Sequence, residues 1–405
     1  MQKKFSDEIK LILSCAKPEP DNHEIEKVHN LLRLPLDWEF ILKQATSHNI
    51  APLIYHRLNK LDKNELIPSH IFSRLKESYN TSLTWNLLLV KELHLVSDAL
   101  NNAGVDIIPI KGVILAEILY SNIALRGTGD IDILIKSENM LAVEKVLSQA
   151  GYHKDLTEYS ERYYTKYHCH MPYKRTDELG RQFLCEVHWA LSFPRPNIVS
   201  LANIWKSAKR QIIRDKSMFC LSCEDTFFSL SLHLRRYCDP LSLRYICDIS
   251  RLVEVYKNTI NWDYIITESM NNRLISTAYF ALYFAKEMLD APVPEDVLNR
   301  LDPGFIRRKS LQYLIRNKTF SRCLENKRTR QYLYVFLRFL IYDKTKDFLS
   351  YIMFIPIEEF ARFYKLPFDS KKTMVFYRIR IIYIPFKLFS ELLSSSRTSK
   401  APPLT

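Results

Sequence analysis

The chain has 405 residues, of which 47% are hydrophobic, and its 58 Lys and Arg outnumber its 45 Asp and Glu, for a formal net charge of +13. A chain of this length can bury a large core. Its start lacks an apolar leader, and no stretch approaches the roughly 18 uncharged apolar residues that a spanning helix needs. We therefore expect a cytoplasmic protein rather than a secreted or membrane-spanning one. The positive charge favours polyanionic partners, which are nucleotide phosphates, nucleic acid or an anionic membrane surface.

The first quarter of the chain is predicted to be helical. Apolar residues recur at spacings of three and four in residues 9–14 and again in residues 86–100, as they do in amphipathic helices. The second of these helices is expected to stop near Gly104. We therefore predict an N-terminal helical region over residues 1–103.

Residues 104–200 combine strand and helix patterns. Strands are predicted at residues 105–110, 130–135, 159–174 and 182–189, and a short helix at residues 113–120. The chain beyond residue 203 is predicted to be helical again, which gives a C-terminal helical region at 201–394 and a disordered, Ser-, Thr- and Pro-rich tail at 395–405. The expected fold class is α+β, with a small mixed β-sheet core between the two helical regions.

Glycine is concentrated in the predicted core. The chain has only seven glycines, and five of them lie between residues 104 and 151. Glycine permits a positive φ and a close approach of the backbone to a ligand, which a phosphate-holding turn requires. Gly112 and Gly129 are the candidates for such an approach, because they flank the strands and helix described above.

Two aspartates stand two residues apart at the start of a predicted strand. Asp130 and Asp132 therefore point to the same side of the sheet, where their carboxylates can hold a divalent cation. Glu186, on a later strand with apolar neighbours, is the candidate for a third carboxylate. An Asp-x-Asp motif alone is common by chance, but here a strand, Lys111-Gly112 and a helix precede it.

The order of these motifs resembles that of the uncharacterised nucleotidyltransferase family within the polymerase-beta-like superfamily. The resemblance extends over roughly residues 45–255. It is carried by residues 110–120 with Lys111-Gly112, Arg126, residues 129–135, residues 186–189, residues 48–55 upstream, and His233 with residues 243–248 downstream.

This resemblance implies that Asp130, Asp132 and Glu186 are metal-binding carboxylates that hold Mg²⁺, with two ions expected and Mn²⁺ as an alternative, and that an NTP is the substrate. Gly112 then lies in the turn that corresponds to the Gly-Ser loop of the superfamily. This chain has Lys111-Gly112 followed by Val113, so the hydroxyl of that loop is missing. We expect Lys111 to supply positive charge to the phosphates in its place.

Further residues are candidates for nucleotide binding, each with a structural alternative. Arg126 either contacts phosphate or braces its loop through a salt bridge. His188 shares a strand face with Glu186, so it either orients that carboxylate, contacts substrate or has a purely structural role. His233 and Asp248 either close the nucleotide pocket or are a buried histidine and a partner in a helix–helix salt bridge.

Three other motifs each have a structural alternative. Cys220 and Cys223 form a lone Cys-x₂-Cys without a second pair, so we expect no zinc there. His168 and His170 fall on a predicted strand, where acceptor binding is an open alternative. The basic, aromatic segment 371–389 either packs on the protein as an amphipathic helix or binds an anionic membrane.

The predicted function is Mg²⁺-dependent transfer of an NMP from an NTP to a hydroxyl or phosphate of an acceptor, with release of pyrophosphate. The acceptor is open, and a protein, a peptide or other natural product, a small molecule and RNA are all admissible. The alternatives are a non-catalytic nucleotide-binding scaffold, peripheral to a membrane, and a toxin-like enzyme that modifies tRNA.

Overall fold

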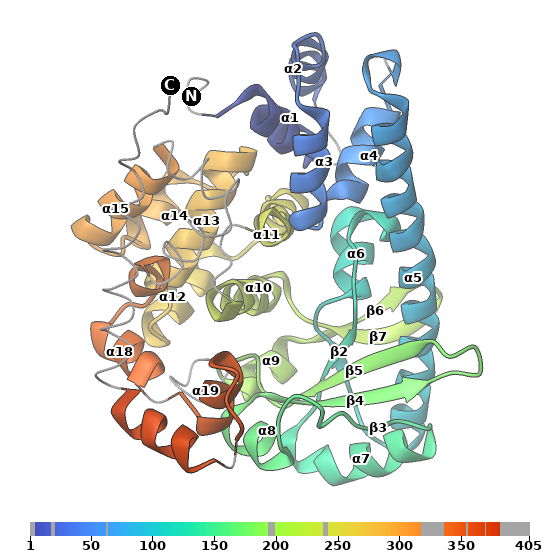
Figure 1. Cartoon of the computed structure of the whole chain (residues 1–405), viewed down its shortest axis with the longest axis vertical. Coiled ribbons are helices and arrows are strands. Elements are labelled where there is room, and N and C mark those ends of the chain that lie inside the picture. The colour runs from blue at the N-terminus through green and yellow to red at the C-terminus, as the bar shows by residue number, and fades with distance from the viewer. Residues whose placement is uncertain are drawn as a thin grey trace.

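The structure is a computed structural model that describes residues 5–17, 21–61, 64–192, 199–237, 242–316, 336–353, 355–368 and 370–380. The predicted disordered tail at 395–405 and the second half of the segment 371–389 lie outside these residues. In the view of Figure 1, the N-terminal helices lie at the top, the sheet at the lower right and the C-terminal helices on the left. The predicted α+β class, with a small sheet between helical regions, is confirmed.

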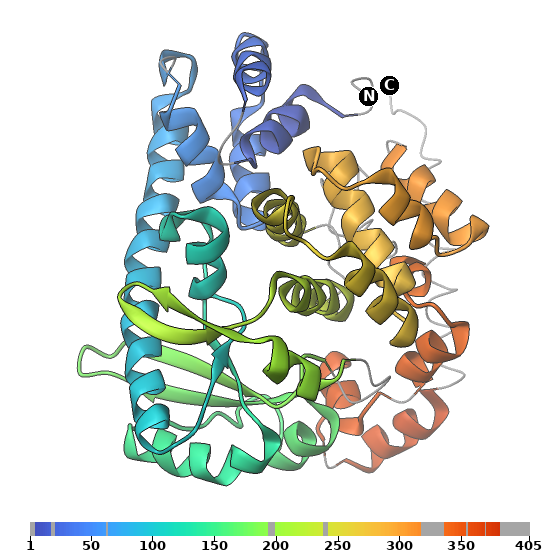
Figure 2. The ribbon, with the colours of Figure 1, turned by 180° about the vertical axis from the view of Figure 1, so that it is seen from behind.

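The N-terminal region is helical, as predicted, and ends in one long helix. Its elements are α1 (Asp7–Cys15), α2 (Asn22–Leu32), α3 (Trp38–Ser47), α4 (Ala51–Asn59), the 3-10 helix η1 (Asn64–Leu66) and α5 (Ser69–Asn102). The helix α5 runs along one edge of the molecule, from the N-terminal helices down to the sheet, as Figures 1 and 2 show from opposite sides. It therefore connects the N-terminal helices with the sheet unit.

The sheet unit follows α5. Its elements are β1 (Ile108–Pro109), α6 (Val113–Tyr120), the 3-10 helix η2 (Ile123–Leu125), β2 (Ile131–Leu134), the 3-10 helix η3 (Ser137–Asn139), α7 (Met140–Gln149), β3 (His153–Lys154), α8 (Glu161–Tyr167), β4 (His170–Thr176) and β5 (Gln182–His188). The strand order is β1-β2-β5-β4-β3, and β2 and β5 are parallel while the other pairs are antiparallel. The predicted helix at 113–120 matches α6.

The two faces of this sheet differ in chemistry. Ile131, Ile133, Cys185 and Val187 belong to a buried cluster that also contains the apolar side chains of α5 and α7. Because side chains alternate along a strand, the residues between them point to the opposite face. This opposite face carries the polar side chains of β2, β4 and β5, and the candidate site is built on it.

The C-terminal region contains the remaining elements. They are α9 (Leu201–Ser207), β6 (Lys209–Ile213), β7 (Lys216–Cys220), α10 (Cys223–Tyr237), α11 (Leu243–Tyr256), α12 (Trp262–Asn271), α13 (Ile275–Leu289), α14 (Glu295–Arg300), α15 (Phe305–Arg316), α18 (Thr345–Met353) and α19 (Ile357–Phe363). The apolar faces of α10, α11 and α13 share one buried cluster with α1, α3 and α4. The two helical regions thus pack on each other, and the sheet unit is held against both.

Two predictions of secondary structure, one in the sheet unit and one in the C-terminal region, are wrong. The strand expected at 159–174 begins only at His170, because residues 161–167 form α8, which Ser160 caps by accepting a hydrogen bond from the Tyr163 amide. The purely helical pattern expected beyond residue 203 is interrupted by the hairpin β6–β7. Its turn, Arg214-Asp215, has two positive φ angles without a glycine, so the usual hairpin signal is absent.

The last described helices return to the sheet unit. The carboxylate of Glu358 on α19 accepts hydrogen bonds from the backbone amide (2.8 Å) and hydroxyl (2.7 Å) of Ser160, and Arg362 pairs with Glu158. These contacts fasten α19 to the start of α8. Residues 371–380 continue as a helix, and no helix within the described ranges is long and apolar enough to cross a membrane.

Candidate metal and nucleotide site

Three carboxylates meet on the polar face of the sheet. Asp132 and Glu186 are direct partners in the register of the parallel strands β2 and β5, and Asp130 immediately precedes β2. One oxygen from each of the three carboxylates lies within 4.8 Å of the others. Asp132 is buried, whereas Asp130 and Glu186 are half-buried and open toward solvent. The structure thus brings together the three residues that the sequence analysis selected as metal ligands.

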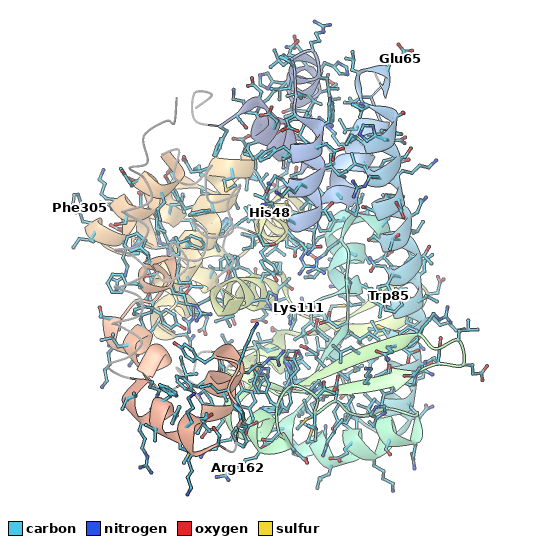
Figure 3. All side chains as sticks on the ribbon, viewed as in Figure 1. His48, Glu65, Trp85, Lys111, Arg162 and Phe305 are labelled. Carbon is cyan, nitrogen blue, oxygen red and sulfur yellow. The ribbon has the colours of Figure 1, made fainter. Side chains whose placement is uncertain are left out.

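Asp132 is already bound by two positive side chains. Lys111 Nζ donates to Asp132 Oδ1 over 2.8 Å, and His188 Nε2 lies 2.9 Å from the same oxygen. His188 Nε2 also lies 3.3 Å from Glu186 Oε2. Lys111 stands near the centre of the molecule in Figure 3, between the sheet and the C-terminal helices. The Lys111 ammonium thus contacts a carboxylate of the cluster, and Lys111 directly precedes Gly112, at which the chain turns into α6.

The charges of this cluster shift the pKa values of its members. Burial and the negative charges of Asp132 and Glu186 raise the pKa of Asp130 to about 7. Burial opposes ionisation of Asp132 as well, but Lys111 and His188 hold the pKa of Asp132 well below its usual range. The crowded carboxylates are thus only partly neutralised by the protein itself, and a divalent cation would remove the remaining repulsion.

The turn before α6 requires its glycine. Gly112 has φ +62°, and a Cβ added there would lie 3.1 Å from Thr128 Cγ2 and 3.2 Å from the carbonyl oxygen of Asp130. Such a backbone conformation is strained for any residue with a side chain. Gly112 thus lets the N-terminus of α6 lie directly against the segment that carries Asp130. Gly129 has an ordinary backbone conformation, and a Cβ added there meets nothing within 4 Å.

This difference gives a stability prediction. We expect Gly112→Ala to lower the free energy of unfolding by about 1–3 kcal/mol because of the positive φ and the close contacts. The matched variant Gly129→Ala should change it by less than about 0.5 kcal/mol. Denaturant unfolding of both variants tests this, and equal effects would contradict the role assigned to Gly112.

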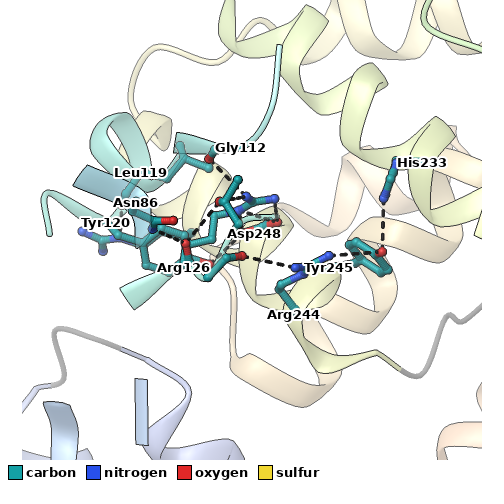
Figure 4. Close-up of polar contacts among 12 residues, drawn as sticks. Asn86, Gly112, Leu119, Tyr120, Arg126, His233, Arg244, Tyr245 and Asp248 are labelled. Atoms are coloured by element: carbon teal, nitrogen blue, oxygen red, sulfur yellow. Dashed lines mark hydrogen bonds and ion pairs between the residues drawn. The ribbon is translucent and has the colours of Figure 1, made fainter. Parts of the chain in front are cut away.

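Arg126 and Asp248 form a buried ion pair, which we call the clamp. Arg126 Nε lies 2.9 Å from Oδ1 and 3.1 Å from Oδ2 of Asp248 on α11, and Arg126 Nη2 lies 3.0 Å from Oδ2. Its Nη1 donates to the carbonyl oxygen of Gly112 over 3.1 Å, and the Tyr120 hydroxyl donates to Asp248 over 2.9 Å. Figure 4 shows these contacts converging on Asp248. Arg126 therefore braces the turn before α6, one of the two roles considered for it, and the phosphate contact stays a prediction.

A second set of contacts leads from this clamp to α10. Arg244 on α11 donates to the carbonyl oxygen of Gly127 (3.3 Å) and to the Tyr245 hydroxyl (3.4 Å), and His233 Nε2 shares a 3.1 Å hydrogen bond with that hydroxyl. Figure 4 shows His233 at the far end of this chain of contacts, away from Asp248. His233 and Asp248 thus do not contact each other, and the nucleotide-binding roles proposed for both stay predictions.

Other residues of the site were not selected from the sequence. Asn86 on α5 donates to the carbonyl oxygens of Ile123 (2.5 Å) and Arg126 (2.8 Å), which fixes the loop before β2. His170 was not expected beside the carboxylates, yet its Nδ1 lies 3.2 Å from Glu186 Oε2. The sequence predicted only that His170 lies on a strand, and the pairing of β4 with β5 puts it beside Glu186.

Cys220 and Cys223 do not contribute to this site. Within the described residues, the groups of side chains that could hold a metal ion all lie between residues 130 and 188, and none includes Cys220 or Cys223. The six described cysteines are free thiols. The expectation that Cys220-x₂-Cys223 binds no zinc stays a prediction.

Comparison with known proteins agrees with the geometry of this site. A family model described as an uncharacterised nucleotidyltransferase matches residues 35–290, which includes the sheet unit, the clamp and α10 to α13. No curated protein and no solved structure matches the chain significantly. The matched segment is longer than the one carried by the sequence motifs and covers more than half of the chain. The chain therefore belongs to the uncharacterised nucleotidyltransferase family.

Proposed function

We propose that this protein is a Mg²⁺-dependent nucleotidyltransferase that moves an NMP from an NTP to a hydroxyl or phosphate group of an acceptor and releases pyrophosphate. The observation that carries the proposal is the convergence of Asp130, Asp132 and Glu186, whose oxygens lie within 4.8 Å of one another beside a glycine turn and a helix N-terminus. Family membership supports the general reaction. The identity of the cation and the chemical class of the acceptor are part of what we propose.

The donor set of the site fits a hard divalent cation. Mg²⁺ and Mn²⁺ prefer carboxylate oxygens, and all three side chains offer them. Burial first, and then the negative charges of Asp132 and Glu186, raise the pKa of Asp130, so a cation bound there would relieve the repulsion among the carboxylates. When bound, the cation would lower the pKa of the acceptor hydroxyl and neutralise charge on the phosphates.

The chain's own residues supply phosphate binding and orientation. The first amides of α6 have no intrahelical partner, and with the positive end of the helix dipole they suit a phosphate. Lys111 precedes this helix by two residues. Although burial opposes it, the neighbouring carboxylates, Asp132 first, raise the pKa of Lys111, so its ammonium stays charged at neutral pH. Lys111 can therefore counter phosphate charge where the superfamily uses a hydroxyl.

The buried clamp fixes the position of these groups. Arg126 binds both Asp248 on α11 and the Gly112 carbonyl, so the turn before α6 is tied to the C-terminal helices. Phosphoryl transfer depends mainly on position and charge rather than on covalent chemistry by the protein. The clamp thus serves to hold the helix N-terminus and the carboxylates at a constant separation.

The proposal is tested with the purified protein, Mg²⁺ and each of four α-labelled NTPs, first alone and then with protein, peptide, small-molecule and RNA acceptors. We expect pyrophosphate release and transfer of label with at least one nucleotide and acceptor, and loss of both in EDTA. If no nucleotide binds in a Mg²⁺-dependent way and no acceptor class yields pyrophosphate, the proposed function is wrong.

A further inference from the structure

Two imidazoles lie on the same sheet face as the carboxylates. In the antiparallel pairing of β4 with β5, His170 is the direct partner of His188, and Glu186 lies two residues before His188 on β5. Alternation along the strands therefore puts the three side chains on one face. His170 and His188 are 4% and 2% exposed, and their ring centroids are 4.6 Å apart. The pair is thus a buried part of the sheet, directly beside Glu186.

The separations within this group match those of ligands on one metal ion. Glu186 Oε2 lies 3.2 Å from His170 Nδ1 and 3.3 Å from His188 Nε2. Two ligands on adjacent corners of a tetrahedral or octahedral ion with bonds of about 2.1 Å lie about 3.0–3.4 Å apart. One ligand atom from each of the three residues lies within 4.8 Å of the others. The three side chains therefore need little rearrangement to share one cation.

We propose that His170, His188 and Glu186 form a second cation position, which takes a first-row transition-metal dication such as Mn²⁺, Co²⁺ or Zn²⁺. Glu186 is shared with the three-carboxylate position, and the inference rests on the proposed function only through this residue. Imidazole nitrogen suits transition metals, whereas Mg²⁺ prefers oxygen ligands and keeps several waters. The two positions thus differ in the cation they select.

The surroundings hold the imidazoles in place. The Tyr164 ring on α8 packs against His168 and His170, with centroids 5.4 Å and 6.3 Å away, and the His168 ring lies 4.1 Å from that of His170. Cys169 also hydrogen-bonds to His188. Ligand histidines in metal sites are oriented by such surrounding contacts.

This group of ligands was not selected from the sequence. The sequence predicted no zinc because Cys220-x₂-Cys223 lacks a second pair of ligands. His170 and His188 come together only through the pairing of β4 with β5.

The first test needs no variant. The wild-type protein is loaded with Mn²⁺ and studied by pulsed EPR, which detects the nitrogen of a coordinated imidazole. We expect a ¹⁴N coupling in the spectrum. A spectrum with couplings from water protons alone would overturn the proposal, because carboxylate and water ligands carry no nitrogen.

The second test uses variants and metal titration. We expect His170→Gln to weaken Co²⁺ binding by at least about 10-fold and to reduce the ¹⁴N coupling to that of the single remaining imidazole, while Mg²⁺ binding is retained. His153→Gln is the matched control, because His153 is exposed on β3. Thermal unfolding of both variants verifies that they are folded, and His188→Gln replaces His170→Gln if the latter does not fold.

The outcomes separate this inference from the proposed function. If Asp130→Asn abolishes Mg²⁺ binding while His170→Gln changes neither Co²⁺ affinity nor the EPR spectrum, the histidine position is wrong and the proposed function stands. If His170→Gln weakens Co²⁺ binding and the ¹⁴N coupling while no nucleotide binds in a Mg²⁺-dependent way and no acceptor class yields pyrophosphate, the histidine position stands and the proposed function is wrong.

Discussion

Replacing Asp130 by Asn is expected to reduce NMP transfer roughly 1,000-fold. Stabilisation of transition-state charge by a bound cation contributes several kcal/mol, and each ~1.4 kcal/mol corresponds to a factor of ten in rate. Asn keeps the shape of the side chain and removes the charge, so the site loses one of its three carboxylate ligands. Pyrophosphate release at saturating Mg²⁺ and NTP measures the effect.

Asp130 is a better target for this test than Asp132. Asp132 binds Lys111 and His188, so its replacement would also leave two buried positive groups without their carboxylate. Asp130 instead adds to the repulsion among the carboxylates. In EDTA we therefore expect Asp130→Asn to be as stable as the wild type or more stable by about 0.5–1 kcal/mol.

Loss of activity with retained stability would assign Asp130 to function rather than to folding. The exposed Glu138 on η3 provides a matched control, and Glu138→Gln should leave both activity and stability unchanged. Transfer by Asp130→Asn within about threefold of the wild-type rate would contradict the assignment of Asp130 as a metal ligand.

The largest effect on stability is expected at the clamp. We expect Asp248→Asn to lower the free energy of unfolding by about 3–5 kcal/mol, because it leaves a buried guanidinium without its countercharge. Arg126 and Asp248 are 6% and 0% exposed, and Asp248 also accepts the hydroxyl of Tyr120. Denaturant unfolding measures the loss, and Mg²⁺-dependent nucleotide binding at low temperature shows whether the turn before α6 has moved.

An exposed ion pair serves as the control for the clamp. Arg300 and Asp263 lie on the surface, with side chains 46% and 78% exposed, so Asp263→Asn should change stability by less than about 1 kcal/mol. The double variant Arg126→Met/Asp248→Leu should recover part of the loss, because it removes both buried charges. If Asp248→Asn is no more destabilising than Asp263→Asn, the clamp does not stabilise the fold as described.

Several features of this protein follow from local sequence. The spacing of Asp130 and Asp132 puts both carboxylates on one side of a strand whatever the strand pairs with. The helix after Gly112 follows from apolar periodicity, and its glycine turn from the concentration of glycines in the core. Glu186 was selected because a carboxylate between apolar neighbours on a strand needs a reason to be there. The helix and the closeness of the three carboxylates are observed in the structure, whereas the metal-binding role of the carboxylates stays a prediction.

Other features depend on contacts between distant segments. The partner of Arg126 lies 122 residues away on α11, and no local pattern distinguishes this pairing from a phosphate contact. The hairpin β6–β7 turns without glycine, and α8 occupies a segment whose aromatic residues favour a strand. In both segments, tertiary packing prevails over local preference.

The sequence by itself determined the class of fold, the three carboxylates and the family, because periodicity, residue spacing and motif order are properties of the chain. Only the tertiary structure decided that Lys111 contacts Asp132, that Arg126 binds Asp248, and that His170 contacts Glu186. The register between strands and the docking of helices bring these side chains within a few ångströms, and both depend on the packing of the whole core.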